Sequence, residues 1–275
     1  MNAWTSFVGA LPFEWAQYEF MQYALLAVLM LAPLFALLGC LVINNQMAFF
    51  SEAMGHSAFT GLAIGALLGL QEPTLAIAGF AVLLALTIFA VRRWSAVPLD
   101  TVIALGMAVG VALGVVLLSR GGGFARYSRY LIGDILTVTP HEVLRLGVLL
   151  VCVLVLWSLF FNAVFFVSLN RSLAASRGLP VWLIEAVFAI VLAVVVAVSI
   201  PWVGLLVINS LLILPAAAAR NLARSTRGYV LGAVAVALVA GVAGLICSYY
   251  WDTAAGATIV LWAGAAFAVT LVVRR

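Results

Sequence analysis

The sequence predicts an all-α membrane protein, a polytopic helical bundle with about eight or nine transmembrane helices. Hydrophobic residues make up 67% of the 275 positions, only 8% of the residues are charged, and the mean hydropathy is +1.28. A soluble domain of this length carries about a quarter charged residues. Lipid must therefore cover most of the exterior, and unpaired backbone groups restrict the spanning segments to helices.

Nine stretches are apolar over about 20 residues, the length that a helix needs to cross a bilayer. We expect helices at residues 20–43, 47–70, 73–92, 99–119, 141–168, 180–200, 202–222, 228–250 and 254–273. The seventh contains Pro215, which favours a broken or tilted helix. Because no soluble domain interrupts the series, we expect residues 1–275 to form a single membrane domain.

Two stretches are too polar to span. Residues 121–140 begin with three glycines and then mix aromatic, apolar and charged side chains, which favours an interfacial or re-entrant segment. Residues 170–178 lie between two long apolar helices and precede Pro180, which fits a cytoplasmic helix of about two turns. Their composition leaves two interpretations open, a connecting loop and a docking element.

The arginines predict the orientation. If the N-terminus lies outside, nine of the 13 arginines fall in segments that face the cytoplasm, as the positive-inside rule requires. These nine are Arg92, Arg93, Arg171, Arg177, Arg220, Arg224, Arg227, Arg274 and Arg275. With nine spans the C-terminus is then cytoplasmic. The arginines are too scattered along the chain to indicate a nucleic-acid partner.

The most informative polar residues are Glu52 and His56, in the second expected helix. Their spacing of four puts them on one helix face, and His56 lies near the middle of the bilayer. A charge at that depth costs at least about 2.5–3.5 kcal/mol, so such groups normally face a protein interior or an aqueous path. Carboxylate oxygen and imidazole nitrogen together suit zinc, manganese or ferrous iron. A Glu–His hydrogen bond that only joins neighbouring helices is the alternative.

Other polar residues within the expected spans are less specific. Glu185 lies near the cytoplasmic end of its helix, where it can reach headgroups or an interfacial arginine, so we expect a structural anchor. Asn209 and Ser210 lie deeper and are secondary candidates for a transport path. No GxxxxGK[ST] phosphate loop occurs, so we expect the chain not to be an enzyme and not to hydrolyse ATP.

Taken in order, several blocks resemble the permeases of bacterial zinc, manganese and iron ABC importers, the ABC-3 family. The block SEAMGHSAFTGLAIG is similar to the family's acid-xxx-His helix, with Glu52 in place of the usual Asp. LDTVIALGMAVGVALGVVLLS, YLIGDILTV and WVGLLVINSLLILPAAAARNLARS resemble later blocks, and NRSLAASRGLP occupies the place of the cytoplasmic coupling helix. The similarity covers nearly the whole chain.

The resemblance implies a permease subunit that moves divalent zinc, manganese or iron ions into the cytoplasm by alternating access, with no bound cofactor. Glu52 and His56 would contact the metal in transit. The implied partners are cytoplasmic ATP-binding subunits, an extracytoplasmic solute-binding protein and a second permease protomer, by default an identical one. The implied ATPase-docking segment consists of Asn170, Arg171, Ser172, Leu173, Ala174, Ala175, Ser176, Arg177 and Gly178. The implied location is the lipid of the bacterial cytoplasmic (inner) membrane.

Two features depart from the family pattern. Asn44 and Asn45 stand where arginines often precede the acid-xxx-His helix, and Asn170 replaces the acidic residue that usually opens the coupling segment. Two other functions stay open: an ABC permease for a metal chelate or a cobalamin-like cargo, and an ion-coupled secondary transporter. The first is generally a longer chain, and the second is expected to show an internal repeat with paired broken helices, which is not evident here.

Overall fold

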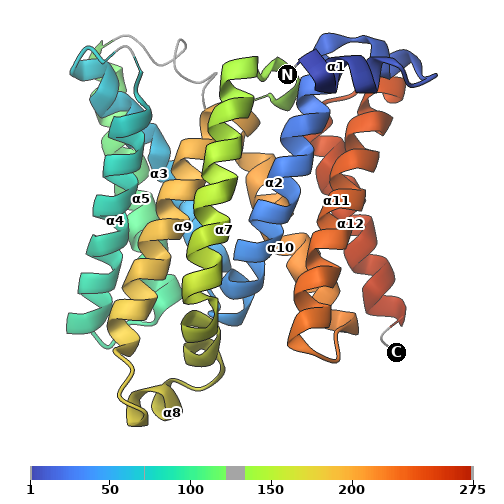
Figure 1. Cartoon of the computed structure of the whole chain (residues 1–275). Coiled ribbons are helices and arrows are strands. Elements are labelled where there is room, and N and C mark those ends of the chain that lie inside the picture. Colours follow the sequence, from blue (N-terminus) through green and yellow to red (C-terminus); the bar gives the residue numbers. More distant parts are fainter. Residues whose placement is uncertain (1, 71, 122–133, 274–275) are drawn as a thin grey trace. The chain divides into compact units, whose positions relative to one another are not determined.

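The computed structural model describes residues 2–70, 72–121 and 134–273, and every regular element in these ranges is a helix (Figure 1). The nine long helices are α2 (Glu19–Asn44), α3 (Ala48–Leu67), α4 (Thr74–Trp94), α5 (Leu99–Gly121), α7 (Pro140–Leu169), α9 (Val181–Val203), α10 (Leu205–Leu222), α11 (Thr226–Trp251) and α12 (Ala255–Val273). Eight of them are long and apolar enough to cross a membrane, and α3 is the exception. The prediction of an all-α polytopic bundle is confirmed.

The structure differs from the predicted helices near Pro201, Gly204 and Pro215. Pro215 lies inside α10, which continues as one helix to Leu222. Likewise α9 runs through Pro201, and the break before α10 occurs at Gly204, whose φ of 86° a residue with a side chain rarely adopts. The described residues also contain four short helices: α1 (Asn2–Gly9), η1 (Glu14–Gln17), η2 (Ile135–Thr137) and α8 (Arg171–Ser176). Of these, α8 was expected from the sequence, and η2 lies within the expected interfacial or re-entrant segment 121–140.

The helices form two compact units. The first contains α1, η1, α2, η2, α10, α11, α12 and the part of α7 up to Leu159. Its central helix is α2, in which Leu31, Leu34 and Phe35 have no exposed surface. A side chain at Gly39 would collide with the backbone of Leu212, so the glycine lets α2 lie directly against α10.

The second unit contains α3, α4, α5, α8, α9 and the rest of α7. Within it α3 packs against both α4 and α5. It has 20 residues, so at about 1.5 Å per residue it is long enough to cross the apolar core. Its lower hydropathy follows from these neighbours, because a helix covered by protein does not need lipid-facing side chains.

Within each unit several arginines lie near the helix ends, although Arg145 lies near the start of α7. In the second unit Arg92 and Arg93 lie in the last turn of α4, at the end where α8 is found. In the first unit Arg220 lies in the last turn of α10, and Arg227 lies at the start of α11. The end of α12 also lies at this end of the first unit, opposite α1. Which end faces the cytoplasm stays a prediction.

Candidate functional site

Glu52 and His56 lie on one face of α3, about one and two turns, respectively, from its N-terminal end. Nε2 of His56 is 3.9 Å from Oε1 of Glu52, which is too long for a hydrogen bond and close enough for both atoms to contact one ion. The two side chains are 49% and 46% exposed, respectively. The fold therefore brings the two donors together and leaves both accessible.

The residues of α3 around Glu52 and His56 are buried. From Phe50 to Ala63, every residue is buried except Glu52 and His56. Met54, between the two residues, and Ser57, directly after His56, have no exposed surface. Between Phe50 and Ala63 the exposed surface of α3 thus belongs to its polar pair, which is the opposite of the pattern that lipid contact selects.

Small residues hold α3 in this position. A Cβ at Gly61 would lie 2.5 Å from Cα of Ile77 in α4, so the two helices touch backbone to backbone. On the α5 side, the hydroxyl of Thr60 donates a hydrogen bond to the carbonyl of Gly110. The absence of a side chain at Gly61 thus lets α3 approach α4 closely, and the Thr60 hydrogen bond joins α3 to α5.

The pair supplies two metal-binding groups, a carboxylate and an imidazole. Among the described residues, no group of three or more His, Cys, Asp or Glu side chains could hold a metal ion. A structural zinc site normally has four protein ligands. Glu52 and His56 thus supply two possible ligands, fewer than a structural zinc site has.

The predicted docking segment contains a well-capped short helix. Oδ1 of Asn170 accepts a hydrogen bond from the amide of Leu173 at 2.9 Å, so the residue that departs from the family pattern serves as the N-cap of α8. At the other end Gly178 has a φ of 77°, and the amide of Leu179 donates to the carbonyl of Ala174. This is a Schellman motif.

Nearly all of the predicted docking segment is exposed to solvent. Between residues 170 and 178, Ala174 is buried and every other residue is exposed. Leu173 in particular keeps 44% of its surface exposed, although it is a large apolar side chain. The segment is thus anchored at one residue and presents most of its surface outward, as a docking element would.

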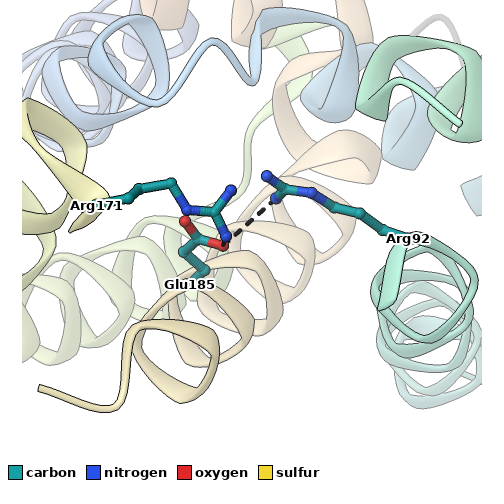
Figure 2. Close-up of polar contacts among 3 residues, drawn as sticks. All are labelled: Arg92, Arg171 and Glu185. Carbon is teal, nitrogen blue, oxygen red and sulfur yellow. Dashed lines mark hydrogen bonds and ion pairs between the residues drawn. The ribbon is translucent and has the colours of Figure 1, made fainter. Parts of the chain in front are cut away.

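Glu185 joins α8 to α4 (Figure 2). Its Oε2 accepts hydrogen bonds from Arg171 of α8 at 2.8 Å and from Arg92 of α4 at 3.4 Å. The sequence predicted that Glu185 could reach an interfacial arginine, and the structure confirms this. It did not single out Arg92 as the second partner, which lies 93 residues away along the chain.

The remaining candidates lie elsewhere. Asn209 and Ser210 belong to α10, and within the described part of the chain Asn209 Oδ1 and Ser210 Oγ are buried without a hydrogen-bond partner. That these two residues line a transport path stays a prediction.

Of the expected interfacial segment 121–140, residues 122–133 lie outside the described residues. Asp134 precedes η2 and caps it by accepting from the amide of Leu136 at 3.0 Å.

Comparisons with known proteins give a consistent result. The sequence profile of the ABC 3 transport family matches residues 17–274. The high-affinity zinc uptake system membrane protein ZnuB of Haemophilus influenzae is 30% identical over 263 residues, which cover 94% of this chain and 99% of that protein. The manganese import system permease protein ScaB of Streptococcus gordonii is 29% identical over 254 residues, which cover 92% of this chain and 91% of that one.

A solved structure has the same fold. PsaBC from Streptococcus pneumoniae, determined in complex with Fab, matches with a TM-score of 0.80 and 26% sequence identity. The match covers 98% of this chain and 95% of the other. The similarity in sequence and in structure thus extends over nearly the full length.

Proposed function

Because the chain belongs to the ABC 3 transport family, we propose that it is the permease subunit of an ATP-binding-cassette importer that moves zinc or manganese ions into the cytoplasm. The two relatives support this cargo, since one is named for zinc uptake and the other for manganese import. Neither is named for iron, which the sequence also allowed. Family membership favours an ATP-driven permease over an ion-coupled secondary transporter.

The exposure pattern of α3 carries the proposal for the site. Glu52 and His56 are the residues between positions 50 and 63 that are not buried, and both would be costly against lipid. An aqueous path beside α3 removes this cost, because water and a passing cation solvate the carboxylate. Glu52 and His56 then contact the ion in transit as a weak, temporary site.

The energy source in this proposal is a separate pair of ATP-binding subunits in the cytoplasm. They dock on residues 170–178, whose exposed surface surrounds α8. ATP binding and hydrolysis move α8 and re-orient the helices beside the path, so that the site opens to one side at a time. An extracytoplasmic solute-binding protein delivers the ion, and a second, identical permease protomer completes the path.

This arrangement sets the proposed location and orientation. The protein lies in the cytoplasmic (inner) membrane of a bacterium with its N-terminus outside, so that the arginine-rich ends of both units face the cytoplasm. The chain then acts as one permease domain.

Transport by purified protein tests the proposal. The permease is reconstituted in liposomes with its ATP-binding subunits, and uptake of zinc, manganese and iron is measured with each metal competing against the others. We expect ATP-dependent uptake of zinc or manganese as the free ion. Uptake of metal chelates alone, or uptake that continues without ATP-binding subunits, contradicts the proposed function.

A further inference from the structure

We propose that Glu185 is a positioning residue that transmits the movement of α8 to α3, and thereby to Glu52 and His56. The inference rests on the proposed function, because it assigns a role in transport to a side chain outside the metal path. Three observations carry it: the ion pairs of Glu185, the aromatic contacts that continue from Arg92, and a polar cavity beside them.

The first observation is that one buried oxygen atom connects three elements (Figure 2). Glu185 belongs to α9 and its side chain is only 10% exposed, whereas Arg171 opens α8 and Arg92 ends α4. A carboxylate with so little access to water depends on both guanidinium groups for its stability. When α8 moves, Arg171 moves with it, and the pairing of Glu185 with Arg92 must adjust.

The second observation is that the contacts continue from Arg92 to α3. The guanidinium carbon of Arg92 lies 6.0 Å from the ring centroid of Phe89, one turn earlier in α4. The ring of Phe89 meets that of Phe50 edge to face, with centroids 6.5 Å apart. Phe50 belongs to α3, has no exposed surface, and precedes Glu52 by two residues. A chain of side-chain contacts thus leads from α8 to the helix that carries Glu52 and His56.

The third observation is a cavity that gives these groups room to move. A polar space of about 240 Å³ is lined by Arg92, Arg171 and Glu185 and by the residues Gln46 and Met47 that lead into α3. Gln46 has a φ of 56°, so the backbone turns sharply at this point. A fully packed cluster would hold a single arrangement, whereas this space allows the arginines a second one.

A static role is the competing explanation. If Glu185 only staples three elements together, its loss weakens the fold, and assembly, ATP hydrolysis and uptake fall together. If it transmits movement, the ATP-binding subunits still bind and hydrolyse ATP, but less metal crosses for each ATP. The number of metal ions transported per ATP hydrolysed therefore separates the two explanations.

The main experiment compares wild type with Glu185→Gln in liposomes that contain the complete complex, with zinc and manganese as the probes. Arg177 still contacts Phe166 of α7 at 5.3 Å and Ala174 stays buried, so α8 keeps its place and its exposed surface. We expect normal co-purification of the ATP-binding subunits. Metal transported per ATP should fall by at least about fivefold, the lower range of coupling between distant sites.

Two further variants keep the result interpretable. Arg92→Gln breaks the ion pair to α4 but leaves the Glu185 carboxylate paired with Arg171 at 2.8 Å, so it removes one charged partner rather than the shared carboxylate, and it should show the same loss. Asp100→Asn removes an exposed carboxylate from the first turn of α5 in the same unit and should leave the ratio unchanged.

An unchanged ratio in Glu185→Gln, or in Arg92→Gln where the first variant does not fold, overturns the inference while leaving the proposed function intact. A loss of equal size in Asp100→Asn also overturns it. If the wild-type complex itself shows no ATP-dependent uptake of zinc or manganese, the proposed function fails, and the role of Glu185 falls with it.

Discussion

Replacing Gly61 with alanine tests how closely α3 and α4 approach. The new Cβ would lie 2.5 Å from Cα of Ile77 and 2.9 Å from the carbonyl oxygen of Ala76, and both atoms belong to the backbone of α4. Carbon atoms in contact lie about 3.5–4.0 Å apart, so the two helices must separate locally by about 1 Å. Overpacking of this kind costs about 1–3 kcal/mol.

The assay is thermal unfolding of the purified permease in detergent, with Gly79→Ala as the matched control. Gly79 also lies in a long helix of this unit, α4, but an added Cβ there meets nothing within 4 Å. At the mid-range cost of about 2 kcal/mol, Gly61→Ala lowers Tm by about 4–8 °C. Gly79→Ala leaves Tm unchanged or raises it slightly, because alanine favours the helix. Equal Tm values for the two variants would refute the close packing of α3 on α4.

Two other substitutions test local contacts. Gly178→Ala forces a side chain into a φ of 77° and should destabilise the C-terminal turn of α8 by about 1–2 kcal/mol, measured as faster hydrogen exchange of the backbone amides at position 178 and at Leu179. Faster exchange should be absent in Gly79→Ala, and its absence in Gly178→Ala would contradict the Schellman motif. Thr60→Val removes the hydroxyl that bonds to Gly110 and should lower stability by about 1 kcal/mol; Thr87→Val, whose hydroxyl bonds within its own helix, should cost less.

The spanning helices were predictable because length and hydropathy decide them. Even α3, whose composition alone does not mark it as a span, was expected from the apolar residues around Glu52 and His56. The break at Gly204 was not predicted, because Pro201, three residues earlier in the sequence, is the stronger local signal. A glycine adopts a positive φ only when the packing around it requires one, and packing cannot be derived from one short stretch.

The candidate site was predictable in part for a similar reason. Glu52 and His56 share a face because they are four residues apart, which is a local property of the helix. Their exposure depends on which neighbours cover the rest of α3, and the pairing of Glu185 with Arg92 spans 93 residues. The caps of α8 had local signals, since asparagine favours the N-cap and glycine the position after the C-cap.

Metal uptake by the His56→Ala complex tests the central claim most directly. The chain contains two histidines, and His141→Ala is the matched control because His141 is exposed in the first turn of α7, away from α3 in the sequence. Both variants should assemble with the ATP-binding subunits. Zinc and manganese uptake should fall to background in His56→Ala and stay at the wild-type level in His141→Ala. Full uptake by a well-assembled His56→Ala complex would contradict the assignment of the transport site.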